Sequence, residues 1–172
     1  MRRRTILMIK MMRVDERLIH GQVAVVWSKY LGTDRIVVAN DEVVKNEMQM
    51  MALKMAVPSS IKANIKSVDD AIKILNDPRG EKLKIFIVVG SPKDACKVAE
   101  SVKGIELINI GNYGRMEQSS GVNGEKREKL DNNVYVTKED RKYLKELTEY
   151  DAKVNVQVVP TEVEKLLKNI IK

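Results

Sequence analysis

The stretch Lys84-Ile-Phe-Ile-Val-Val-Gly-Ser-Pro-Lys-Asp-Ala-Cys-Lys-Val-Ala-Glu-Ser101 passes from a short apolar run into an amphipathic segment. The run Ile85 to Val89 is rich in β-branched residues and lacks polar alternation, which is typical of a strand buried on both faces of a sheet. Ser91 precedes Pro92, and a serine N-cap before a proline at the first helical position indicates a helix start. The stretch therefore predicts a buried strand that leads directly into a helix.

The same alternation of short β-branched runs and longer amphipathic segments extends along the chain. Because parallel strands can be joined only by a crossover, this order indicates βαβ units. We predict an α/β fold: a three-layer open, mainly parallel twisted sheet of about six or seven strands with helices on both faces. The expected strands are Ile6 to Val14, Arg35 to Ala39, Lys62 to Lys66, Lys84 to Val89, Glu106 to Ile110, Asn133 to Val136 and Val154 to Val159. The expected helices are Gly21 to Leu31, Asp41 to Ala56, Val68 to Asn76, Pro92 to Ser101, Lys138 to Glu149 and Thr161 to Ile171.

Two further capping signals support these helix starts. Thr137 is followed three residues later by Asp140, and Thr161 by Glu164, so both stretches have the form of a capping box. No linker rich in proline, glycine or serine divides the chain, and no internal repeat is visible. We therefore expect a single domain over residues 1–172.

Composition limits the classes of function. The chain has 31 Lys and Arg against 24 Asp and Glu, and this net charge of +7 favours anionic partners. Its one cysteine, Cys96, excludes an intrachain disulfide and a multi-cysteine metal site, and indicates a reducing compartment, by default the cytoplasm. Lys10 and Arg13 interrupt the apolar run near the N-terminus, so we expect neither a signal peptide nor a membrane-spanning segment.

The segment Arg13-Val-Asp-Glu-Arg-Leu-Ile-His-Gly-Gln22 contains the only histidine of the chain, His20. It follows the first expected strand and precedes the first expected helix. In open α/β sheets this carboxyl edge of the strands is where ligands bind. Alternatively, His20 is a solvated loop residue, and the arginines merely pair with Asp15 and Glu16.

A phosphoryl-accepting histidine needs a neutral imidazole, a partner for one ring nitrogen, and positive charge around the transferred group. Asp15 could orient the ring or fix the loop by pairing with Arg13, and Arg17 could donate to phosphoryl oxygens. The amides of Gly21 and Gln22 would add the partial charge of a helix start, and Gly21 allows close backbone approach. A metal site is not indicated, because the chain has neither a second histidine nor a pair of cysteines. A nucleophile elbow and glycine-rich nucleotide loops are absent from the sequence.

The longer stretch Arg13 to Trp27 resembles the active-site signature of IIB components of the mannose/fructose/sorbose family of the bacterial phosphoenolpyruvate-dependent sugar phosphotransferase system. The likeness continues through Ile36-Val-Val-Ala-Asn-Asp-Glu-Val-Val44 and Val156-Gln-Val-Val-Pro160. It implies that His20 accepts a phosphoryl group on Nδ1 from a IIA component and donates it to a sugar through the membrane components IIC and IID. Arg17 matches an arginine that helps hold the phosphoryl group in that family.

The resemblance further implies a covalent phosphohistidine without a cofactor or metal, and a cytoplasmic location at the inner face of the membrane. A homo-oligomer is compatible with the sequence. Two rival hypotheses stay open. One is a degenerate family member that acts as a regulator without passing phosphate onward. The other is a basic α/β domain that binds an anion or nucleic acid, although aromatics make up only 4% of the chain and leave little for base stacking.

Other residues have simpler expected roles. Cys96 falls inside an expected helix and is interpreted as a small buried filler rather than a phosphoryl carrier. Trp27 is expected in the core. For the methionines of the second expected helix, core packing is favoured over a docking patch; they are Met48, Met50, Met51 and Met55. The charged run 124–129 is expected to be a solvated surface segment rather than a nucleic-acid patch.

Overall fold

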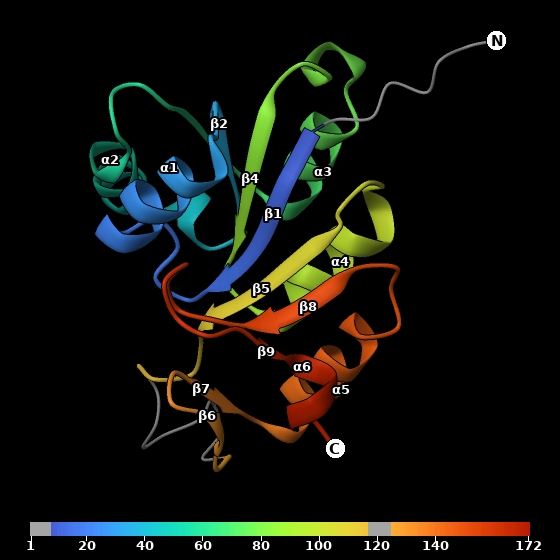
Figure 1. Ribbon diagram of the computed structural model, residues 1–172. Coiled ribbons are helices and arrows are strands. Elements are labelled where there is room, and N and C mark those ends of the chain that lie inside the picture. The colour runs from blue at the N-terminus through green and yellow to red at the C-terminus, as the bar shows by residue number, and fades with distance from the viewer. Residues whose placement is uncertain (1–7, 117–124) are drawn as a thin grey trace, which may run out of the picture.

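The computed structural model describes residues 8–116 and 125–172, and its centre is a twisted seven-stranded sheet in the order β3-β2-β4-β1-β5-β8-β9 (Figure 1). Neighbouring strands pair in parallel, except that β9 is antiparallel to β8. The predicted mainly parallel α/β sheet is thus confirmed. The strands are β1 (Met8–Asp15), β2 (Arg35–Ala39), β3 (Lys62–Lys66), β4 (Lys84–Val89), β5 (Leu107–Asn112), β8 (Lys153–Val156) and β9 (Lys165–Leu166).

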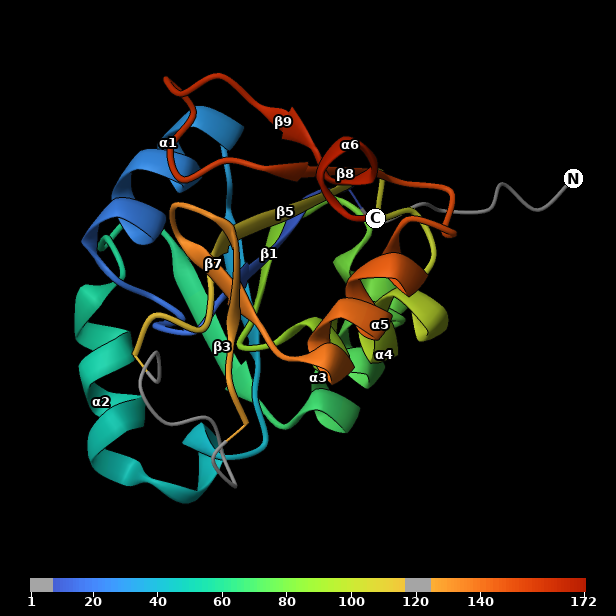
Figure 2. The ribbon, with the colours of Figure 1, turned by 90° about the horizontal axis from the view of Figure 1, so that it is seen from below.

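Helices cover both faces of the sheet. Figure 2 shows α1 and α2 on one side and α3, α4 and α5 on the other. A π-helical segment, η1, leads into α1, and a 3-10 turn, η2, precedes α2. The segments are η1 (Gln22–Trp27), α1 (Ser28–Leu31), η2 (Val43–Lys45), α2 (Glu47–Ala56), α3 (Val68–Leu75), η3 (Pro78–Gly80), α4 (Pro92–Ser101), α5 (Lys138–Leu147) and α6 (Leu167–Ile170).

Strand β4 illustrates why this sequence forms a three-layer structure. Its side chains alternate between the two faces, so Ile85 and Ile87 join the core beneath α3, α4 and α5. Phe86 and Val88 join the second core beneath η1 and α2. All four are buried, as the uninterrupted apolar run predicted. After β4 the Ser91 hydroxyl accepts a hydrogen bond from the Asp94 amide at 3.2 Å, which confirms the predicted start of α4.

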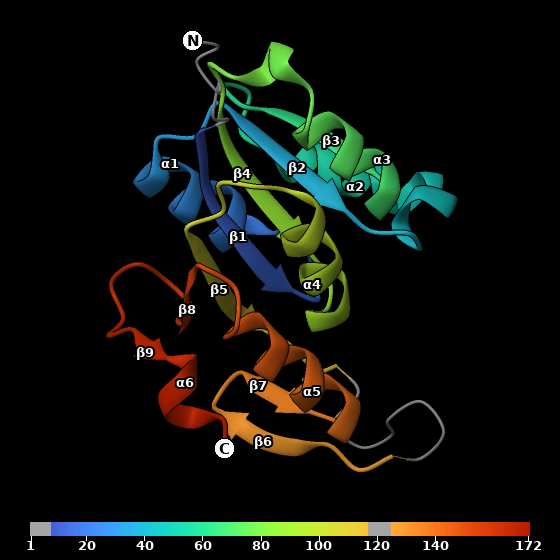
Figure 3. The same ribbon diagram turned by 90° about the vertical axis from the view of Figure 1, so that its right-hand side faces the viewer.

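The predicted strand at Asn133 to Val136 does not belong to the main sheet. Instead β7 (Val134–Val136) pairs antiparallel with β6 (Glu128–Asp131), and this hairpin lies beside α5 (Figure 3). An isolated parallel bridge joins Val134 of this hairpin to Tyr113, the residue that follows β5. The apolar pattern of the strand was correct, but its partner is a charged strand that the sequence did not reveal.

The helix predicted from Thr161 to Ile171 is wrong over its first half. Residues 161–164 form no helix; β9 follows, and α6 covers only Leu167–Ile170. The Glu164 carboxylate, expected to complete a capping box, instead accepts hydrogen bonds from Lys153 and from Asn155 Nδ2. These contacts hold Glu164 beside β8, next to the point where β9 pairs with that strand.

The helix expected from Asp41 begins six residues later, at Glu47. The Asn40 side-chain oxygen accepts hydrogen bonds from the amides of Glu42 and Val43, and these bonds form a separate turn ahead of the helix. Asn46 then caps α2 through the amide of Gln49 at 3.1 Å. Among the residues that the structure describes, no helix has the length and apolar character needed to cross a bilayer.

The two sequence-predicted capping boxes provide a matched pair for experiment. At Thr137 both hydrogen bonds of the box form, with Asp140 as the reciprocal partner, whereas Thr161 caps no helix in the described structure. We expect Thr137→Ala to lower the free energy of unfolding by about 1 kcal/mol, because the first turn of α5 loses its cap. Urea denaturation measures this loss. Thr161→Ala serves as the control and should change the midpoint little; equal losses in both variants would contradict the assignment.

Candidate active site

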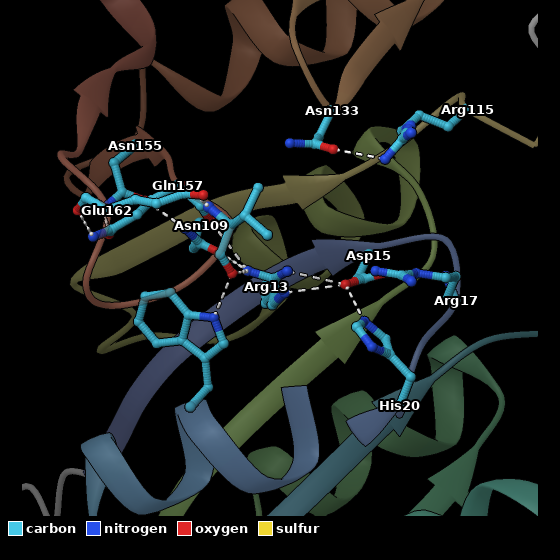
Figure 4. Close-up of polar contacts among 12 residues, drawn as sticks. Arg13, Asp15, Arg17, His20, Asn109, Arg115, Asn133, Asn155, Gln157 and Glu162 are labelled. Carbon is cyan, nitrogen blue, oxygen red and sulfur yellow. Dashed lines mark hydrogen bonds and ion pairs between the residues drawn. The ribbon is translucent and has the colours of Figure 1, made fainter. Parts of the chain in front are cut away.

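The central strand β1 carries two buried charges at its carboxyl end. Arg13 and Asp15 point to the same face of the strand, and both side chains are fully buried. Asp15 Oδ2 accepts hydrogen bonds from Arg13 Nε at 3.2 Å and from Arg13 Nη2 at 3.1 Å (Figure 4). Buried charges need such pairing, since each unpaired ion costs several kcal/mol.

The same carboxylate holds His20 and the loop between them. His20 Nε2 lies 2.9 Å from Asp15 Oδ2, and the Arg17 amide donates to Asp15 Oδ1 at 3.0 Å. The Asp15 carboxylate therefore contacts the His20 ring and pairs with Arg13 at the same time. The sequence had suggested the two contacts as alternatives. Burial by itself raises the pKa of Asp15, but the hydrogen bond from His20 and the charge of Arg13 outweigh burial and hold that pKa below its ordinary value.

This contact selects one tautomer of a neutral His20. An ionised carboxylate can only accept hydrogen bonds, so the ring proton must be on Nε2. Nδ1 then presents its lone pair, and no described residue makes a hydrogen bond to it. The His20 side chain is 18% exposed. The ring is therefore partly buried and partly accessible from solvent.

The loop between Asp15 and His20 is tightly bent. The Leu18 amide donates to the Asp15 carbonyl at 2.9 Å, and Leu18 has a left-handed φ of 57°. A non-glycine residue in that region costs about 1–2 kcal/mol. The buried side chains of Leu18 and Ile19 offset that cost through core contacts. The bend returns His20 to the carboxylate five residues upstream.

A second set of hydrogen bonds holds the Arg13 guanidinium through its other terminal nitrogen, Nη1. Its Nη1 donates to Asn109 Oδ1 at 2.7 Å and to the carbonyls of Gln157 and Val158 at 3.2 and 3.1 Å. The Trp27 indole donates to the Val158 carbonyl at 2.8 Å, which confirms the predicted core role of Trp27. Burial lowers the pKa of Arg13, opposed by Asp15. Because Arg13 is buried, the geometry supports its loop-orienting role and leaves no path to a phosphoryl group.

Arg17 and Gly21 are exposed near His20, and Gln22 follows Gly21 in the chain. The Arg17 side chain is 45% exposed, with Nε 3.8 Å from Asp15 Oδ1, so its guanidinium has donors left for a ligand. Gly21 is exposed, and no atom lies within 4 Å of where a Cβ would project. Gln22 begins η1, but its side chain lies outside the described part of the structure. The first helical bond runs from the Ala24 amide to the His20 carbonyl.

Glu16 has a role that sequence reasoning missed. Its carboxylate accepts hydrogen bonds from three consecutive amides, those of Gly114 (2.9 Å), Arg115 (3.0 Å) and Met116 (3.2 Å). The His20 loop is thereby joined to the segment after β5. Three amides on one carboxylate cannot be read from a sequence, because the acceptor and donors lie about a hundred positions apart.

The asparagines behind the site were also missed. Asn109 and Asn155 are buried on adjacent strands and join through Asn109 Nδ2 and Asn155 Oδ1 at 2.8 Å. A signal existed, because both interrupt otherwise apolar strands, and a buried amide needs a polar partner. Together with Arg13 they form a polar line across β1, β5 and β8.

Predictions for residues outside the site had mixed outcomes. Cys96 is a buried filler as predicted: its thiol donates to the Tyr143 carbonyl, and burial raises its pKa to about 12. Core packing is wrong for most of the methionines, since Met48, Met51 and Met55 are 64–83% exposed. Of these four methionines, Met50 alone packs on the core.

Across residues 8–116 and 125–172, no three potential ligands converge as a metal site would require.

Comparisons with known proteins agree with the fold and with the family that the sequence resembles. The family model described as "PTS system sorbose subfamily IIB component" matches residues 9–172. A probable phosphotransferase enzyme IIB component of Streptococcus pyogenes is 42% identical, over 95% of this chain and 99% of that protein. The crystal structure of the IIBSor domain of the sorbose permease from Klebsiella pneumoniae superposes with a TM-score of 0.85 at 27% identity, covering 96% of each chain.

A longer relative matches this chain over part of its own length. The mannose-specific EIIAB component of Escherichia coli is 27% identical over 165 residues. The match covers 96% of this chain but 49% of that protein. About half of the relative therefore has no counterpart in this chain.

The packing of Arg13 predicts a strong effect at Gly111. A Cβ on Gly111 would lie 2.0 Å from Arg13 Cζ, so Gly111→Ala must displace a buried, paired guanidinium. We expect a loss of about 3–5 kcal/mol in the free energy of unfolding, the range for breaking a buried ion pair. Gly21→Ala adds the same methyl group in open space and should change stability by less than about 0.5 kcal/mol. Urea denaturation of both variants tests the difference.

The lowered pKa of Asp15 predicts a pH-dependent stability. The ionised carboxylate stabilises the fold above its unfolded pKa, near 3.8, and this contribution is lost as pH falls through the lower folded pKa. We therefore expect the stability difference between wild type and Asp15→Asn to be largest near neutral pH and to shrink in that acid range. Chemical denaturation across the range measures the difference.

Asp70 provides the control for this experiment. Its pKa is also lowered, by a hydrogen bond from Lys73, but both side chains are exposed. Solvent screens such pairs, so Asp70→Asn should give almost no difference at any pH. A difference at Asp15 that is as small, or that does not change with pH, would contradict the role of the buried carboxylate.

Proposed function

The chain belongs to the sorbose-subfamily IIB components of the phosphotransferase system, and we propose that within this system it is a histidine phosphocarrier that accepts a phosphoryl group on His20 and passes it to a sugar. The observation that carries the proposal is the contact between His20 Nε2 and the buried carboxylate of Asp15. This contact leaves Nδ1 as the free ring nitrogen, the atom that the family resemblance implies.

The transfer to His20 is a single exchange of nitrogen–phosphorus bonds. The Nδ1 lone pair attacks the phosphorus of a phosphohistidine on the donor, and the donor's P–N bond breaks with its electron pair returning to the donor ring. Phosphorylation leaves His20 with a proton on Nε2 and a substituent on Nδ1, so the ring becomes cationic. The adjacent Asp15 carboxylate stabilises that charge without accepting the proton.

The phosphoryl oxygens need positive charge on the outer side of the ring. Arg17 is exposed and lies on the same loop, so its free donors can reach an incoming oxygen. The amides at the start of η1, at Gly21 and Gln22, add a partial positive charge beside open space. In the second step a sugar hydroxyl attacks phosphorus and releases its proton to solvent, and the P–N electron pair returns to Nδ1.

A IIA component is the proposed phosphoryl donor. The name of the Escherichia coli relative joins A and B parts in one chain, and this chain matches about half of its length, which supports a IIA partner. Transfer onward to the sugar would then use the membrane components IIC and IID from the cytoplasmic side. Neither a metal nor a cofactor has a step in this proposal, because Arg17 and backbone amides supply the charge.

The experiment follows a phosphoryl group from phosphoenolpyruvate to the chain. The protein is incubated with phosphoenolpyruvate, the general phosphotransferase proteins and the IIA component of its own system, and intact mass is measured. We expect one acid-labile phosphoryl group on the peptide that contains His20, and NMR of the imidazole should assign it to Nδ1. His20→Ala should remain unphosphorylated.

Arg17→Ala should be phosphorylated about 100-fold or more slowly, as when one charge-stabilising donor is lost, and Arg17→Lys should restore part of the rate. Circular dichroism checks that each variant is folded. Phosphate on His20→Ala would overturn the assignment. A folded wild type that stays unmodified while IIA is phosphorylated would favour the regulatory or anion-binding alternative.

A further inference from the structure

A groove of about 410 Å³ adjoins the His20 loop and runs to α2. Its base is apolar, with Leu18 and Val43 buried and Leu53 half-buried. The groove is lined by Glu16, Arg17, Leu18, Asn40, Glu42, Val43, Gln49, Ala52, Leu53 and Met116. Because Arg17 and Leu18 belong to both the loop and the groove, the groove begins where the proposed phosphoryl site ends.

The acidic residues of the groove are already paired. The Glu16 carboxylate accepts three backbone amides, and Glu42 forms an ion pair with Lys45 at 3.1 Å. They therefore repel an approaching phosphoryl group less than free carboxylates would. The Glu16 contacts also hold Met116, whose side chain is 74% exposed, at the border of the groove.

Helix α2 extends this surface with apolar side chains that cover nothing in the described structure. The helix has no buried residue, and its inner side packs through Met50 and Leu53. Met48, Met51 and Met55 follow the i, i+3, i+7 spacing of a single helix face, opposite that inner side. Ala52 lies between this methionine face and the groove, so the two form one continuous surface.

We propose that the groove and the methionine face of α2 together form the docking surface for the phosphorylated IIA donor; this inference rests on the proposed function. Direct transfer requires the donor phosphorus to come within about 3–3.5 Å of Nδ1. A specific interface covers roughly 800 Å² on each partner, far more than one histidine and its loop. The donor must therefore cover surface beside Arg17, and the groove is such a surface.

The chemistry of the surface defines the kind of donor face that fits. Methionine is enriched in interface cores and adapts its shape to a partner, whereas exposed charges of one sign would indicate an acidic or basic partner face. Among the described residues that line the groove, Arg17 is the only cation, and it lies at the end next to His20. We infer a donor face with apolar side chains around its phosphohistidine, the phosphoryl group meeting Arg17.

The test compares two phosphoryl donors on the same variants. Ala52→Trp fills the groove without changing charge, and Asn169→Trp places the same neutral side chain on the exposed surface of α6. Phosphoramidate, a small phosphoryl donor, needs no docking surface. The protein donor is the phosphorylated IIA component that modifies the unaltered chain.

We expect Ala52→Trp to lower the rate from phosphorylated IIA about tenfold or more, through a raised KM rather than a changed kcat. Its rate with phosphoramidate should equal that of wild type, and Asn169→Trp should match wild type with both donors. Should Ala52→Trp fail to fold, the double variant Met51→Gln and Met55→Gln tests the same surface. It keeps side chains of similar length and should weaken IIA transfer several-fold.

The other outcomes are distinct. An unchanged rate of transfer from IIA in Ala52→Trp and in the Met51→Gln and Met55→Gln double variant would overturn the docking proposal and leave the proposed function intact. Slower reaction with both donors would assign the groove to the phosphoryl site itself, also against the proposal. If the variants slow only the transfer from the chain to the sugar, the membrane partners bind this surface instead of IIA. If the wild type forms a dimer that the variant loses, a second copy of the chain binds there. No phosphate on wild type from either donor would reject the proposed function and the docking surface with it.

Discussion

One buried carboxylate determines the arrangement of the candidate site. Asp15 lies at the end of the central strand, where water cannot solvate it, so its charge must be balanced by protein groups. Arg13 balances it from inside, and His20 and the Arg17 amide contact it from the loop side. The orientation of the imidazole thus follows from an electrostatic requirement of the core, and the ring nitrogen left for chemistry follows from that orientation.

The same requirement explains the polar interior of the neighbouring strands. A buried guanidinium has more donors than one carboxylate can satisfy, so β5 contributes Asn109 and the end of β8 contributes carbonyl groups. Asn155 continues the line to Glu164, which ties β9 to the sheet. The first half of the segment that the sequence had suggested to be helical does not form a helix, because the Glu164 carboxylate belongs to this network.

The surface around the site differs in kind from its interior. Inside, fixed ion pairs and hydrogen bonds hold each group in one geometry. Outside, an apolar groove and flexible methionines on α2 can change shape against a partner. The phosphocarrier role that we propose needs both properties: a rigid nucleophile for the transfer, and an adaptable surface that binds a protein donor and releases it.

The sequence by itself determined the features that depend on neighbouring residues. β-Branched runs predicted the strands of the parallel sheet, Ser91 and Thr137 predicted two helix starts, and the segment around His20 indicated both its place at the carboxyl edge and its family. Such signals are local, because strand burial and capping arise within a few residues.

Only the tertiary structure decided the long-range pairs. It showed that Glu164 binds β8 instead of capping a helix, that Gly111 leaves room for Arg13, and that the outer methionines of α2 have no core to fill. The tautomer of His20 likewise follows from the 2.9 Å contact with Asp15, not from their spacing. The physical reason is that a charge or an apolar side chain is satisfied by whatever the fold brings beside it, and distant parts of the chain supply those neighbours.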